Sequence, residues 1–214
     1  MKTKSIILNL LTIAAAATIA GCASSGYEKG AKTAEDIQSA ANRIAALPGK
    51  IDGALNALDE LVTKPQANLV PKFKAFSGQL ADLVTEGKDI MAARHSLADN
   101  GKAFFAKWDE QLAQIQNEDI KARSQSRKAE VAQKLADIKR SYAEAEVAFK
   151  PFLSDLKDVQ KYLSVDLTAG GVAAMKDSAA KASKEAGPLK DSIGKVAADF
   201  KALGLAMSAV TPAQ

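Results

Sequence analysis

The chain has little of what builds most catalytic and metal sites. Its 214 residues include one cysteine, one histidine and one tryptophan, and aromatic residues make up 5% of the total. A single cysteine cannot form an intramolecular disulfide, and with a single histidine it leaves too few ligands for a structural zinc ion. The motifs GxGxxG, GxxxxGK(S/T), HExxH and GxSxG are also absent from the sequence. We therefore expect a protein that is not an enzyme and that needs no metal or cofactor.

The chain also lacks a large excess of charge. Its formal net charge is +4, and removal of an N-terminal segment that contains Lys2 and Lys4 would leave +2. A strong positive field attracts nucleic acid, and so small an excess over nearly two hundred residues does not provide one. We expect no nucleic-acid partner.

The first 21 residues have the three zones of a bacterial export signal. Lys2 and Lys4 are followed by an apolar run over residues 6–19 and then by the small residues Ala20 and Gly21. The run is shorter than the about 20 residues that span a bilayer. We predict a removable signal peptide over residues 1–21.

The cysteine directly follows this signal. Ile19-Ala20-Gly21-Cys22 closely resembles the lipobox of bacterial lipoproteins, in which the cysteine thiol receives a diacylglyceryl group before cleavage. A chance cysteine after an ordinary signal peptide is the alternative, and the position of the sole cysteine argues against it. We predict covalent lipid, such as palmitate, on Cys22 and a membrane anchor of several acyl chains.

The residues after the cysteine suggest where the protein is placed. Ala23, instead of an aspartate, follows Cys22, which favours the outer membrane over the inner one by resemblance to lipoprotein sorting. The body would then face the periplasm. Residues 22–32 contain a Ser-Ser-Gly sequence and a second glycine, so we expect the lipidated cysteine to be followed by a short flexible tether.

Apolar residues recur at alternating steps of three and four residues over residues 33–208. The first stripe includes Ile37, Ile44 and Ile51, and the last includes Ile193 and Phe200. This average period of 3.5 residues is typical of helices that pack lengthwise against one another. The interruptions lie at 64–71, at 116–126 and at 166–171, where Thr168 is a candidate N-cap. The predicted helices cover about 33–63, 70–117, 120–164 and 169–208, before a disordered tail at 209–214.

Short connections between long helices give antiparallel neighbours. The predicted fold is therefore all-α, an elongated antiparallel four-helix coiled-coil bundle. Pro48, Pro151 and Pro188 fall inside predicted helices and should kink or interrupt them. Gly87 and Gly101 occupy stripe positions fourteen residues apart, where small residues allow helices to approach closely.

Two features are candidates for contact with a partner. Lys121, Arg123, Arg127 and Lys128 form the densest basic segment, which is either a solvated helix end or a tip that meets anionic polymer or lipid phosphate. Phe104 and Trp108 keep the heptad spacing and are expected in the core, whereas the residue after Phe104 is out of phase. That residue, Phe105, is a candidate exposed aromatic contact. His95 has no second histidine or cysteine beside it, and we expect it on a helix flank.

The sequence also resembles a known family. The similar segments run from Phe104 through Trp108 to Leu112, from Ile115 to Asn117 and on to Arg123-Ser124, and from Tyr142 through Pro151 and Leu163 to Thr168. Together they resemble a bacterial family known as domain of unknown function 2959, over most of the mature chain. This resemblance implies a helical, coiled-coil envelope protein, often with a lipoprotein signal. It implies no activity, cofactor or catalytic residue.

These observations favour a non-enzymatic envelope lipoprotein that acts as a structural or scaffolding rod. Its partners would be the membrane, through the lipid, and an envelope protein or a second copy, through its helices. The alternative is a bundle of the cell envelope that binds lipid or another small ligand, in a groove near Gly87, Gly101 and Trp108.

Overall fold

A computed structural model describes residues 26–64 and 67–208 of the chain, and every regular element within them is a helix. Four helices are long: α1 (Gly26–Thr63), α2 (Val70–Leu112), α3 (Glu118–Val165) and α5 (Lys176–Met207). A short helix, α4 (Ala169–Ala174), lies between the last two. The predicted signal peptide, Cys22 and the C-terminal tail lie outside the described residues.

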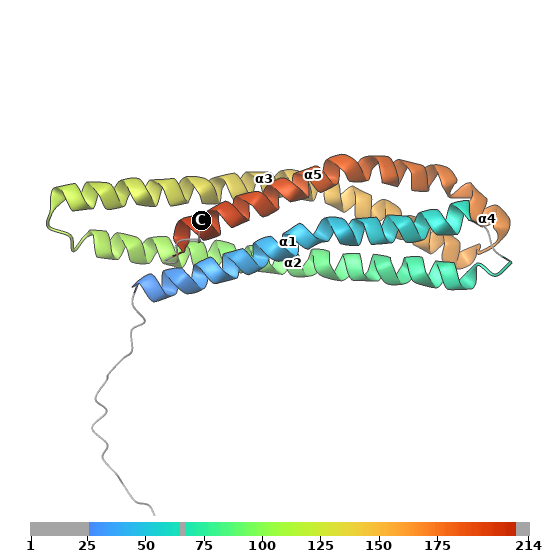
Figure 1. The fold of residues 1–214 in the computed structure, drawn as a ribbon, viewed down its shortest axis with the longest axis horizontal. Coiled ribbons are helices and arrows are strands. Elements are labelled where there is room, and N and C mark those ends of the chain that lie inside the picture. The colour runs from blue at the N-terminus through green and yellow to red at the C-terminus, as the bar shows by residue number, and fades with distance from the viewer. Residues whose placement is uncertain (1–25, 65–66, 209–214) are drawn as a thin grey trace, which may run out of the picture.

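The long helices lie lengthwise in an elongated antiparallel bundle (Figure 1). Helix α1 packs against α2 and α5, and α3 packs mainly against α5 and makes fewer contacts with α2. The start of α1, the α2–α3 turn and the end of α5 therefore share one end of the rod. The predicted all-α helical bundle is confirmed.

The heptad stripes form one continuous core. Nearly every predicted stripe residue of α1 and α5 is buried, and the same holds for α2 as far as Ile90 and for most of α3. Beyond Ile90 the stripe of α2 is only partly covered, with Phe104 and Trp108 half-buried and Gln111 exposed. The bundle is thus tightly packed except where α2 approaches its C-terminal end.

The helix boundaries correct the expected ones in three places. Helix α1 begins at Gly26, so the tether expected over residues 22–32 is helical from Gly26 onward. Helix α2 ends at Leu112, and the turn that follows is completed by Asn117, whose side chain accepts hydrogen bonds from the backbone N–H groups of Asp119 and Ile120. This side-chain cap starts α3 at Glu118 and moves the second turn ahead of the expected 116–126.

The fourth predicted helix is two helices. Thr168 caps α4 as predicted, since its hydroxyl accepts from the backbone N–H of Gly171 at 3.1 Å. The helix is interrupted at Met175, whose backbone N–H donates to the carbonyl of Val172 in a tighter turn. Met175 is neither a proline nor a glycine, so its residue type did not predict this helix break.

The three internal prolines do not end their helices. Pro48, Pro151 and Pro188 lie inside α1, α3 and α5, which continue through them. Helix α5 changes direction partway along its length (Figure 1), as expected where an internal hydrogen bond is missing. Within residues 26–64 and 67–208, no helix is apolar over enough length to cross a membrane.

Candidate functional site

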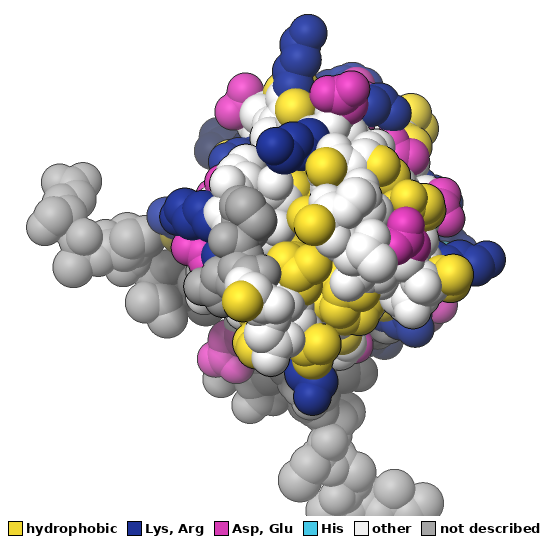
Figure 2. Space-filling view, turned by 90° about the vertical axis from the view of Figure 1, so that its right-hand side faces the viewer, with side chains coloured by type: hydrophobic (Ala, Val, Ile, Leu, Met, Phe, Trp, Pro, Cys, Tyr) yellow, Lys and Arg dark blue, Asp and Glu magenta, His cyan; other side chains and the backbone are white. Residues whose placement is uncertain are grey.

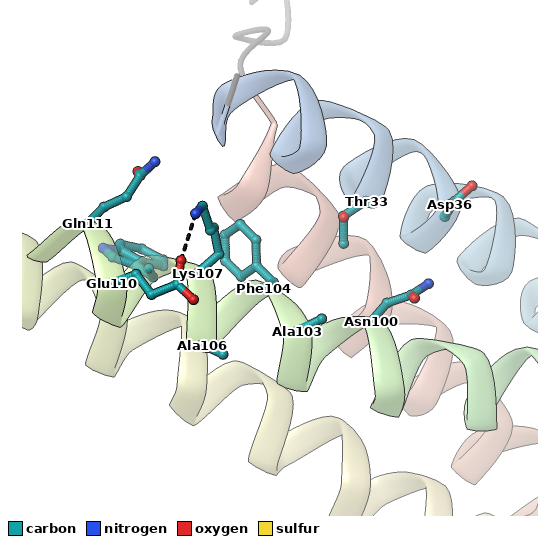
Figure 3. Close-up of a pocket in the computed structure, with 10 residues that line it drawn as sticks. Thr33, Asp36, Asn100, Ala103, Phe104, Ala106, Lys107, Glu110 and Gln111 are labelled. Carbon is teal, nitrogen blue, oxygen red and sulfur yellow. Dashed lines mark hydrogen bonds and ion pairs between the residues drawn. The ribbon is translucent and has the colours of Figure 1, made fainter. Parts of the chain in front are cut away.

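A groove lies at the end of the rod where α1 begins. It has a volume of about 860 Å³ and lies between the first turns of α1 and the last third of α2. Figure 3 shows Phe104 rising from α2 into this space, with Thr33 directed toward it from α1. We call it the α1–α2 groove; it is lined by Thr33, Asp36, Asn100, Ala103, Phe104, Ala106, Lys107, Trp108, Glu110 and Gln111.

Three aromatic rings of α2 form a cluster at this groove. The Phe104 ring meets the Trp108 ring edge-on at 5.4 Å, and Phe105 stacks beside Trp108 at 6.5 Å with an interplanar angle of 12°. The Trp108 indole N–H donates to the Ser124 hydroxyl of α3 at 2.9 Å, which fixes the ring between the two helices. Trp108 thus links the cluster to α3, whereas Phe104 lines the groove without packing against the core.

The expectation for Phe105 is corrected by its surroundings. Its side chain is half-buried and packs against the core, and the Lys128 ammonium lies 5.9 Å from its ring centre. The heptad pattern places Phe105 outside the apolar stripe of α2, but α3 crosses α2 on that side and covers the Phe105 side chain. Phe104, expected in the core, is half-buried and lines the groove together with Trp108.

The basic segment lies within α3, one turn after its start, and most of its charge is balanced. Lys121 is 3.7 Å from Glu118, Arg127 is 2.7 Å from Glu130, and Lys128 pairs with Asp109 of α2. Arg127 also donates to the carbonyl of Ala206 at the end of α5. Arg123 is exposed, and no ion pair joins it to another residue of the described chain. The structure thus does not bring the four cations together around one open site.

A polar cluster crosses the narrow contact between α2 and α3. The guanidinium of Arg94 lies 4.6 Å from the Tyr142 ring centre and 3.4 Å from the Glu146 carboxylate. Lys150 bonds to Glu146 at 2.6 Å and, with Arg94 and His95 nearby, lowers the pKa of that carboxyl. Burial raises the pKa of the Tyr142 phenol. These groups neutralise one another, so the cluster is a structural contact between the helices.

The glycines of α2 do not open a groove. A β-carbon at Gly87 would lie 2.9 Å from the Phe149 ring, and one at Gly101 would lie 3.3 Å from Leu135. Both glycines accept a large side chain of α3, and the cavity left beside Gly87 measures only about 50 Å³. Of the three residues named for a ligand groove, only Trp108 lines a hollow large enough for a small molecule.

No pattern in the sequence pointed to the groove residues of α1. Thr33 and Asp36 fall in the segment where a helix was only just expected to begin, and Ala103 lies off the heptad stripe of α2. The sequence contains one partial signal for the groove: after Ile90 the stripe of α2 includes the polar residues Arg94 and Gln111, which indicates that this part of α2 is incompletely buried. His95 is exposed, and the described residues contain no cluster of three or more His, Cys, Asp or Glu residues arranged to hold a metal ion.

One comparison with known proteins gives a match. A family model described as "Protein of unknown function (DUF2959)" matches residues 20–201. No curated protein and no solved structure matches the chain.

Proposed function

The chain belongs to the DUF2959 family of proteins of unknown function, and we propose that it is a non-enzymatic structural rod of the bacterial cell envelope. In this proposal, lipid on Cys22 holds one end of the bundle in the outer membrane. The helices extend into the periplasm and present their surfaces to an envelope protein or to a second copy.

The sequence supports the anchor, and the position of α1 indicates which end of the rod it would hold. The signal-like segment ends at Ile19-Ala20-Gly21-Cys22, and α1 begins only four residues later, at Gly26. Four extended residues reach at most about 14 Å. An acylated Cys22 would therefore hold the start of α1 close to the membrane and direct the α4 end of the rod away from it.

The observation that carries the proposal is an apolar patch at that far end. Figure 2 views the rod from the end that bears α4, and apolar side chains gather in the middle of it with charged residues around them. Val165, Tyr162 and Val70 are large apolar residues exposed at this end, and Val165 is 87% exposed. Exposed apolar patches with a polar rim are typical of protein–protein contacts. We call these three residues the end patch.

Crosslinking in living cells tests the end patch. A photoreactive amino acid at Val165 should give a discrete crosslinked product, to an envelope protein or to the chain itself. The same amino acid at Val147, which is 76% exposed midway along α3, is the matched control and should give none. Equal labelling at both positions, or no product at Val165, would count against an end-on partner.

The absence of catalysis is part of the proposal. It is supported by the mutual pairing of Arg94, Glu146 and Lys150 and by the small volume enclosed between the helices near them. Catalytic groups need a concave site that restricts water. Turnover in a broad hydrolase screen, lost on substitution of Glu146, would contradict it.

A second candidate function is a bundle that binds lipid or another small ligand. The observation that favours it is the α1–α2 groove, whose about 860 Å³ falls within the usual range of small-molecule sites. A native mass spectrum of the purified protein with a co-purified lipid would support this candidate.

A further inference from the structure

We propose that the α1–α2 groove binds one fatty acyl chain of a phospholipid from the membrane that holds the protein. The inference rests on the proposed anchoring at Cys22, because that anchor determines which end of the rod meets the bilayer.

The lining of the groove suits an acyl chain. Ala103, Ala106, Phe104 and Trp108 supply apolar surface, and the short alanine side chains leave room beside the rings. The other lining residues are polar: Lys107, which pairs with Glu110 at 2.6 Å, and Asn100 and Gln111 lie on the same helix, and Thr33 and Asp36 lie on α1. An apolar surface bordered by polar groups suits an amphipathic ligand.

The dimensions agree with a single chain. The α2 part of the lining runs from Asn100 to Gln111, which corresponds to about 17 Å of helix at 1.5 Å per residue. One leaflet contributes about half of the roughly 30 Å hydrocarbon core of a bilayer, so an acyl chain in place has a similar length. The groove is therefore long enough to hold one acyl chain along α2.

The position of the groove indicates which lipid would supply the acyl chain. The groove opens between the start of α1 and the end of α2, at the same end of the rod as the α2–α3 turn. Since Cys22 is four residues before Gly26, its lipid would hold this end at the membrane surface. Phospholipids of the same leaflet are then the most concentrated apolar molecules within reach. Because the groove is open on one side, the bound acyl chain would stay partly in the bilayer. The lipid would then add a second contact between the rod and the membrane and would not be extracted.

Trp108 provides a direct test because it is the only tryptophan of the chain. The probe is a lysophospholipid with a nitroxide on its single acyl chain, used below its micelle-forming concentration with residues 23–214. The core residues of the part of the chain that the structure describes lie within 34–203, so this shortened chain keeps that core. We expect saturable quenching of Trp108 fluorescence by more than half, reversed by an unlabelled lysophospholipid.

Ala103→Glu should weaken this binding at least tenfold, since it adds a charge to the apolar lining. Ala103 is exposed on α2, so the substitution should not unfold the bundle, and Ala75→Glu on the opposite end of α2 is the matched control without effect. Ala103→Leu, which fills the groove without charge, should weaken binding as well. Absent quenching, or equal quenching in the wild type and both Ala103 variants, would overturn the proposal.

The anchor is tested separately by mass spectrometry of Cys22 in protein from cells. An unmodified thiol together with saturable, Ala103-dependent quenching would overturn the anchoring and the membrane as the source of the lipid. A lipidated Cys22 without quenching would overturn the groove proposal alone.

Discussion

Gly171 occupies a position where no β-carbon fits. A β-carbon there would lie 2.2 Å from the backbone carbonyl oxygen of Asp166 and 2.7 Å from its side-chain Cγ. We expect Gly171→Ala to destabilise the protein by about 1–3 kcal/mol, because the turn before α4 must move. Thermal unfolding would show this as a melting temperature lower by about 2–4 °C for each kcal/mol.

Gly78 in α2 and Gly194 in α5 are the matched controls. A β-carbon at either position meets nothing within 4 Å. Alanine has a higher helix propensity, so each replacement should stabilise the protein by up to about 1 kcal/mol. A Gly171→Ala protein as stable as these two would contradict the crowding at Asp166.

Glu146 gives the protein a predictable dependence on pH. Lys150 and Arg94 lower the pKa of its carboxyl in the folded state below its ordinary value of 4.5. A lowered carboxyl pKa adds stability above the unfolded pKa, and this stability is lost as the pH falls through the folded pKa. Glu146→Gln should therefore cost about 1 kcal/mol at neutral pH, because it breaks two charged contacts at a side chain that is 18% exposed.

Chemical denaturation at several pH values measures this effect. The difference between wild type and Glu146→Gln should shrink between about pH 5 and pH 2, where the wild-type carboxyl becomes protonated. Glu144, which is 3.8 Å from Lys195 and 56% exposed, is the comparison. Glu144→Gln should change stability by less than Glu146→Gln at neutral pH, and a loss that persists at pH 2 would show that packing at Glu146 matters more than its charge.

At the scale of elements, the start of α3 depends on one amide. The Asn117 side chain accepts from the N–H groups of Asp119 and Ile120 at 3.0 and 3.1 Å. Asn117→Ala should cost about 1 kcal/mol of unfolding free energy, since the first turn loses its cap. Asn117→Asp keeps an acceptor at the positive end of the helix dipole and should stay within a few tenths of a kcal/mol of the wild type. Denaturant unfolding that ranks Ala equal to Asp would contradict a capping role.

Ion pairs connect the helices that pack together. Arg43 joins α1 to Glu86 of α2, Lys190 joins α5 to Asp52 of α1, and Lys181 joins α5 to Asp155 of α3. Most of these groups are partly exposed, and such pairs each contribute at most about 1 kcal/mol. Each pair joins residues far apart in the sequence, so together they favour the observed register of the helices.

At the scale of the whole molecule, the fold is a rod. Helix α3 alone has 48 residues and is about 72 Å long. Small-angle X-ray scattering of residues 23–214 should give a radius of gyration of about 22 Å, as expected for a cylinder of this length. A compact globule of the same size would give about 16 Å, and a value near that would contradict the extended bundle.

The sequence by itself determined the helices and most of the core. A period of 3.5 residues specifies which face of each helix is apolar, so the spacing of Ile37, Leu58 and Phe200 was enough to place them in the interior, where all three are buried. The Thr168 cap was also predictable, because a short hydroxyl before a glycine pair has a local partner three residues on. These features depend on contacts within a few turns of one helix.

Only the tertiary structure decided how far side chains are buried where one helix extends past the end of its neighbour. The same heptad spacing continues through Phe104 and Trp108, but α1 no longer covers α2 closely there, and a groove opens. Phe105 is half-buried because α3 crosses beside it, and Lys128 is paired because Asp109 approaches from α2, whereas Lys121 and Arg127 pair with acidic residues of their own helix. Periodicity reports which side of a helix prefers burial, whereas the extent of burial depends on where the other helices begin and end.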